Sequence, residues 1–100
     1  MASFAQPYPY ATTGLSDQEV STIVEVITAL MASARISQWF RCQDEDGATW
    51  LSATDPDGIS PAFMVARKNG QYLVLGKTGQ RRAMGNRLED ILPAVASLSR

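Results

Sequence analysis

Apolar residues recur at helical spacing near the start of the chain, between Leu15 and Ala34. Positions three and four apart lie on one face of an α-helix, so this pattern predicts a helix with one broad buried stripe. Ser16 and Glu19 have the spacing of a capping box, which predicts that the helix begins at Ser16. The opposite face carries small and polar residues, which allow another backbone to approach closely. The predicted stripe consists of Val20, Ile23, Val24, Ile27, Leu30, Met31 and Ala34.

Strands and tight turns are predicted after Ile36, where the helical spacing is lost. Asp-Gly and Asn-Gly pairs supply the left-handed conformations that hairpin turns need, and they lie at 46–47, 57–58 and 69–70, with a further turn at 76–79. Connections this short join antiparallel neighbours, so the pattern predicts a four- to five-stranded meander. The predicted strands are 36–43, 48–54, 61–68, 71–76 and 80–84.

A second helix is predicted at the end of the chain, where Asn86 and Glu89 have capping-box spacing. Pro93 interrupts the apolar stripe of this segment. Either one helix kinks at Pro93, which we favour, or a short first turn gives way to a helix that starts near Pro93. The predicted fold class is therefore α+β, with an N-terminal helix, an antiparallel meander and a C-terminal helix. The second stripe consists of Leu88, Ile91, Leu92, Val95 and Leu98.

The predicted sheet is apolar on both faces, because its strands contain adjacent pairs of large apolar residues and successive side chains point to opposite faces. Two helices cover both faces only if each lies on a different side. Helices of short antiparallel α+β domains usually gather on one face, and this arrangement leaves the other face open to a partner. The alternative is that these residues are simply half-exposed at the edges of a small twisted sheet. The pairs are Trp39-Phe40, Trp50-Leu51, Met64-Val65 and Leu73-Val74.

An uncovered apolar face predicts a non-enzymatic protein-interaction or regulatory module. The expected partner is another protein or a second copy of the chain, since closed two-fold homodimers are the commonest assemblies. Large aromatic residues and methionine are favoured anchors at such interfaces. The candidate partner-binding residues are Trp39, Trp50, Met64 and Leu73.

Length and composition are those of one globular domain: 100 residues, 45% of them hydrophobic and 19% charged. Residues 1–14 contain no ionisable side chain except tyrosine and include Pro7-Tyr8-Pro9-Tyr10, so they are predicted to form a flexible tail before a domain at 15–100. No apolar run approaches the ~20 residues of a membrane helix. A cytoplasmic protein without membrane contact is expected.

Several chemistries are excluded by composition. The chain has no histidine and one cysteine, Cys42, which excludes Ser-His-Asp and Cys-His catalysis, an internal disulfide and a cysteine-rich zinc site. The acidic turns at 44–47 and 55–58 lack the ligand spacing of an EF-hand loop. Gly76-Lys77-Thr78 lacks the preceding loop of a phosphate-binding motif. The sequence thus predicts no enzyme activity, no cofactor and no metal.

Charge is divided along the chain although the net charge is only -1. Residues 1–57 carry eight acidic and two basic side chains, whereas residues 58–88 carry six basic and no acidic ones. An alternative function is therefore nucleic-acid or anionic-ligand binding through the basic 67–87 segment. A third hypothesis is a small-ligand carrier with a pocket between helices and sheet. The candidate anion-binding residues are Arg67, Lys68, Lys77, Arg81, Arg82 and Arg87.

Overall fold

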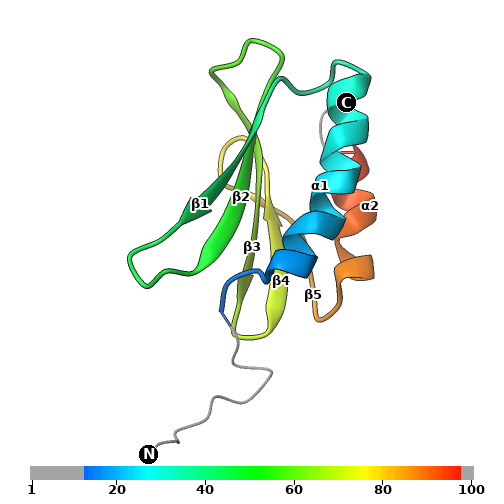
Figure 1. Ribbon diagram of the computed structural model, residues 1–100. Helices are drawn as coiled ribbons and strands as arrows, with labels where there is room; N and C mark the ends of the chain where they lie inside the picture. Colours follow the sequence, from blue (N-terminus) through cyan, green and yellow to red (C-terminus); the bar gives the residue numbers. More distant parts are fainter. Residues whose placement is uncertain (1–12, 98–100) are drawn as a thin grey trace, which may run out of the picture.

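The α+β fold predicted from the sequence is confirmed by a computed structural model that describes residues 13–97 (Figure 1). All neighbouring strands are antiparallel, in the order β1-β2-β3-β4-β5, so the sheet is one five-stranded meander. One helix precedes the sheet, and a 3-10 turn and a short helix follow it. The elements are α1 (Asp17–Ala32), β1 (Trp39–Gln43), β2 (Thr49–Thr54), β3 (Pro61–Lys68), β4 (Gln71–Leu75), β5 (Arg81–Gly85), η2 (Leu88–Asp90) and α2 (Leu92–Ser97).

Helix α1 begins at the predicted capping box. The backbone N–H of Glu19 donates to Ser16 Oγ at 3.2 Å, and the backbone N–H of Ser16 donates to Glu19 Oε1 at 2.8 Å. Two N–H groups that have no partner within the helix are thereby satisfied. The helix ends where Ala34 takes a left-handed conformation, with φ of 60°, and the N–H of Arg35 bonds back to Leu30 O at 2.9 Å.

Both helices lie on the same side of the sheet (Figure 1). Leu51, Val65 and Val74 pair with one another across β2, β3 and β4, and all three are fully buried. Their neighbours in the core are Ile23 and Ile27 of α1, Ile91, and Val95 of α2. One sheet face therefore carries the whole core, which we call the core face. Helix α2 also packs against α1, but the small-residue side of α1 remains mostly exposed.

The end of the chain corrects one prediction. The favoured single kinked helix is wrong: η2 forms a separate 3-10 turn, and α2 begins at Leu92, next to Pro93. Proline has no N–H to donate, which costs nothing in the first turn of a helix, whereas it would break a hydrogen bond farther along. The cap also shifts by one residue from the predicted pair, since Asp90 Oδ2 accepts from the N–H of Arg87 at 3.0 Å.

The backbone just before α1, at Gly14 and Leu15, passes between the ends of β2 and β3, where these two strands diverge. The N–H of Gly14 donates to Arg67 O at 2.8 Å, and the N–H of Leu15 donates to Thr49 O at 3.0 Å. Thr13 and Gly14 thus belong to the folded domain, although the predicted tail included them. The rest of that tail, residues 1–12, lies outside the described residues, as do residues 98–100.

None of the helices within residues 13–97 is long and apolar enough to cross a membrane.

Candidate functional site

The sheet face opposite the helices, which we call the open face, is lined mainly by apolar side chains. Leu51 and Val65 point to the core face, so their neighbours Trp50 and Met64 point to the open face. The pairing of Ala66 with Leu73 continues the same surface onto β4. This face includes Phe40, Cys42, Trp50, Ser52, Met64, Ala66, Leu73, Leu75 and Met84, with Lys68 and Gln71 at one end.

The exposure of these side chains follows their position in the sheet. Trp50, Met64 and Leu73, on the inner strands, are half-buried by their neighbours in the sheet. Phe40 and Met84, on the two edge strands, are 44% and 46% exposed. Neither helix of the described chain lies over this face (Figure 1). The result is a mainly apolar surface that extends over all five strands.

Three of the four predicted partner-binding residues share this surface, and the fourth does not. Trp39 pairs with Ala53, a core-face residue, and packs against the core. Its neighbour Phe40 occupies the open face in its place. The alternation of side chains places these two residues on opposite faces, but only the sheet register decides which one is exposed.

A pocket lies at one end of the open face, where β2 and β3 diverge. Its volume is about 160 Å³. The pocket does not lie between the helices and the sheet, where the carrier hypothesis would place a ligand. Its open-face wall consists of Trp50, Met64, Ala66 and Lys68, and its other lining residues are Thr13, Asp44, Ala48, Thr49 and Arg67.

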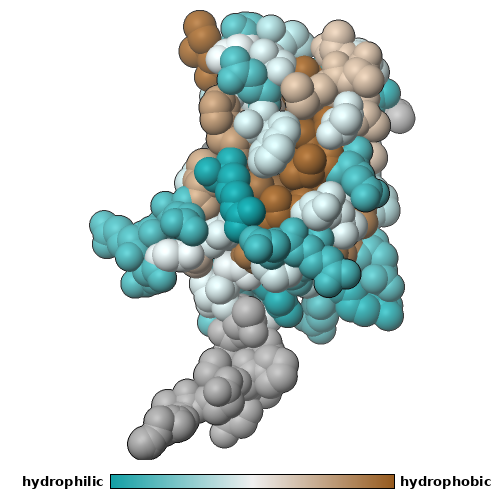
Figure 2. Space-filling view, in the orientation of Figure 1, coloured by the Kyte–Doolittle hydropathy of each residue, from teal (hydrophilic) through white to brown (hydrophobic). Residues whose placement is uncertain are grey.

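A second apolar area is visible between α1 and the strands, framed by hydrophilic residues (Figure 2). The core has a partly exposed margin, since Val24 of α1 and Trp39 of β1 pack against it and are only partly buried. An ion pair of 2.5 Å between Arg41 of β1 and Asp17 of α1 spans the two elements. These contacts hold α1 against β1.

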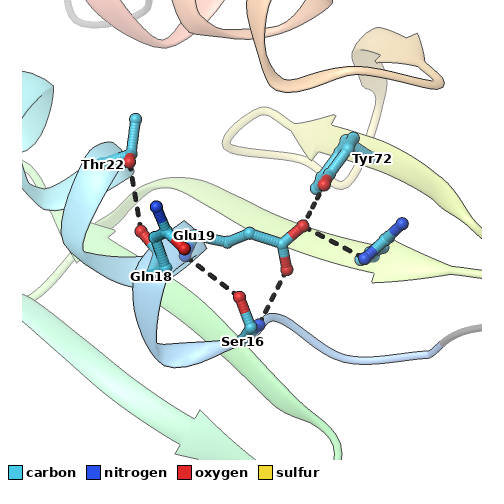
Figure 3. Close-up of polar contacts among 6 residues, drawn as sticks. Ser16, Gln18, Glu19, Thr22 and Tyr72 are labelled. Carbon is cyan, nitrogen blue, oxygen red and sulfur yellow. Dashed lines mark hydrogen bonds and ion pairs between the residues drawn. The ribbon is translucent and has the colours of Figure 1, made fainter.

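A polar cluster joins α1 to β3 and β4 (Figure 3). Tyr72 donates its hydroxyl hydrogen to Glu19 Oε2, and Arg67 Nη1 lies 3.1 Å from the same oxygen. The Arg67 guanidinium also lies 4.8 Å from the centre of the Tyr72 ring, in cation–π geometry. The cap residue Glu19 thus ties the start of the helix to the sheet.

The environment of this cluster shifts two pKa values. Burial raises the pKa of Glu19, but hydrogen bonds from Ser16 and Tyr72 and the charge of Arg67 outweigh burial and leave that pKa below its ordinary value. Burial, reinforced by the hydrogen bond to Glu19 and its charge, raises the pKa of Tyr72 to about 12. Both shifts favour the ionised carboxylate beside a neutral phenol. Sequence reasoning did not find this cluster, because its members are 48 and 53 residues apart.

The six predicted anion-binding residues do not form one patch. Arg67 faces the core side and binds Glu19, whereas Lys77 lies in the β4–β5 turn, 2.5 Å from Asp55. Lys68 lies at the opposite end of β4 from Lys77, in the wall of the pocket. The remaining three, Arg81, Arg82 and Arg87, are exposed on β5 or just after it. Arg81 donates to Met84 Sδ at 3.8 Å, and Arg87 lies 3.7 Å from Glu89.

The acidic turns have structural roles. Asp44 Oδ1 accepts from the N–H groups of Asp46 and Ala48, at 2.9 and 3.0 Å. Asp57 accepts from the Ser60 hydroxyl and from the N–H groups of Ile59 and Ser60, and these bonds lower its pKa. Among residues 13–97, no group of three histidine, cysteine or acidic side chains has the arrangement of a metal site.

Comparison with known proteins adds no further constraint. No protein-family model matches this chain, and neither the curated proteins nor the solved structures include a match.

Proposed function

We propose that this protein is a small non-enzymatic interaction module that binds a second copy of itself through the open face. The observation that carries the proposal is the apolar surface formed by Trp50, Met64 and Leu73, which neither helix in the described chain covers. Leaving apolar surface in water costs about 25 cal/mol per Å². A partner that covers this face removes that cost.

A second copy suits the chemistry of the face. The apolar residues extend across five strands, and the ionised side chains Lys68 and Arg81 lie at the ends of their strands, so an identical face can pack on the apolar residues as in a two-layer β-sandwich. The margin carries charges of both signs, with Lys68 and Arg81 on strands β3 and β5 and Asp44 beside the pocket. A two-fold arrangement repeats the same surface on both partners and can therefore match opposite charges across the margin.

The size of the face predicts a weak dimer. Five strands about 4.8 Å apart and roughly 16 Å long cover roughly 400 Å² in plan. A standard interface buries about 800 Å² per partner. We therefore expect a dissociation constant in the micromolar range and a monomer–dimer equilibrium that responds to dilution.

Sedimentation equilibrium of the full chain tests the proposal. Phe40→Lys and Met84→Lys place a charge on the open face at positions already about half exposed, so they disturb folding little. We expect each to weaken self-association at least about tenfold, since burying an unpaired charge at an interface is costly. Ile59→Lys is the matched control, because Ile59 is 85% exposed in the β2–β3 turn, off the open face. A parent chain that remains monomeric up to millimolar concentration would refute the proposal.

Anion binding is a weaker second candidate, supported by the three arginines at β5 and just after it. Phosphate contacts release counterions, so binding of a polyanion would weaken steeply with added salt. The double variant Arg81→Glu and Arg82→Glu would abolish it. Unchanged polyanion binding by this variant would exclude β5 as the site.

A further inference from the structure

We infer that the pocket at the end of the open face binds the chain's own N-terminal segment, residues 1–12, with the ring of Tyr10 inserted in it. The inference goes beyond the proposed function, because a monomer can make this contact. It follows from where the described chain begins, how large the pocket is and which side chains line it.

The backbone emerges directly at the pocket. Thr13 is one of the lining residues, together with Trp50 and Met64 of the open face. Gly14 then passes between β2 and β3 in a left-handed conformation, with φ of +95°, toward α1 on the core face. Thr13, the first described residue, therefore lies on the side of the open face. A span of three residues reaches at most about 10 Å, so Tyr10 is held within reach of the pocket.

The volume of the pocket matches one aromatic ring. It measures about 160 Å³, and an apolar cavity of about 150 Å³ is large enough to bind benzene. The two residues between Tyr10 and Thr13 are Ala11 and Thr12, which are small. They leave room for the ring to turn back toward the sheet.

The lining suits a phenol ring. Trp50, Met64 and Ala66 provide apolar and aromatic contacts, while Lys68 and Asp44 provide polar groups at the rim. Tyrosine combines an apolar body with a hydroxyl that requires a polar partner. Methionine sulfur and aromatic rings also attract one another. The first twelve residues carry no charged side chain, so moving them onto an apolar face desolvates no charge there.

Fluorescence of Trp50 tests the contact in the full-length chain. Trp39→Phe removes the other tryptophan, and Met84→Lys disfavours the proposed dimer, so the readout reports contacts within one molecule. In this background we expect Tyr10→Ser to raise the acrylamide quenching constant of Trp50 about twofold, because the ring no longer shields the indole. Tyr10→Phe should retain the shielding. Tyr8→Ser is the matched control and should leave quenching unchanged.

Each outcome decides the inference. Quenching that is the same in Tyr10→Ser as in the background chain would overturn it, and so would an equal increase in Tyr8→Ser, which would mean that Tyr10 is not the anchor. A nuclear Overhauser contact between the Tyr10 ring and the Met64 methyl group in the same background would support it, and its absence would overturn it. Sedimentation of the parent chain separately tests the dimer, so failure of one proposal is distinguishable from failure of the other.

Discussion

Glu19→Gln is the sharpest test of how the helix is held to the sheet. Glutamine can keep the capping interaction through its carbonyl oxygen, but it places an NH2 group where Glu19 has Oε2. The change therefore removes two contacts of Glu19 Oε2 together, the ion pair with Arg67 Nη1 and the hydrogen bond from the Tyr72 hydroxyl.

The expected loss follows from the geometry. At an effective dielectric constant of about 20, unit charges 3.1 Å apart attract by roughly 5 kcal/mol. Much of this is offset by the desolvation of both groups, whose side chains are only 20% and 14% exposed. A net loss of about 2 kcal/mol in the free energy of unfolding remains, comparable to a hydrogen bond to a charged group. For a domain of this size, that corresponds to a melting temperature lower by about 10 °C.

The loss should depend on pH. Since the folded-state pKa of Glu19 lies below its ordinary value of 4.5, the ionised carboxylate stabilises the fold at neutral pH. That contribution is lost as the pH falls through the folded-state pKa. The difference between the parent chain and Glu19→Gln should therefore be complete at about pH 7 and much smaller at about pH 3.

Urea unfolding followed by circular dichroism at both pH values measures this difference. Glu25→Gln makes the same chemical change at an exposed position of α1 and is the matched control. Dilute protein keeps self-association from contributing. A loss below about 0.5 kcal/mol at neutral pH, or one of equal size at both pH values, would refute the assignment of the Glu19 carboxylate contacts as stabilising.

Two further predictions follow from the described geometry. Gly14→Ala should destabilise the fold by about 2 kcal/mol in urea unfolding, because a Cβ at φ of +95° would lie 3.1 Å from the backbone of Ala48 and Thr49. The control is Gly47→Ala, which should cost only about 1 kcal/mol because Gly47 has a φ of +82° but open space around it. Equal losses in the two variants would contradict the steric explanation. In a spectrophotometric titration of the phenol groups, one of the three tyrosines should ionise last, at about pH 12. Because the folded-state pKa of Tyr72 is raised, its contribution to stability is present at neutral pH and is lost as the pH rises above about 10. Glu19→Gln should lower this pKa, and a titration that is the same in both chains would show that Glu19 does not act on Tyr72.

Local chemistry determined the elements of this fold. The Ser16–Glu19 capping box, the Asp-Gly and Asn-Gly turns and the helical stripes depend only on residues a few positions apart. Because short turns join neighbouring strands that run antiparallel, the strand order of the sheet also followed from local signals. The exception was the end of the chain, where the cap joins Arg87 to Asp90 instead of Asn86 to Glu89, and a 3-10 turn precedes a short helix that begins at Leu92.

Long-range packing decided the candidate site. Alternation along a strand separates Trp39 from Phe40 and Trp50 from Leu51, but it does not say which member faces the helices. That choice depends on the pairing of all five strands and on both helices packing against one face. The same packing brought Arg67 and Tyr72 to Glu19 and removed Arg67 from the basic surface that its sequence neighbours had suggested. Pairings between residues about fifty positions apart leave no local signal, because they are stabilised only when the whole sheet and helix layer have formed.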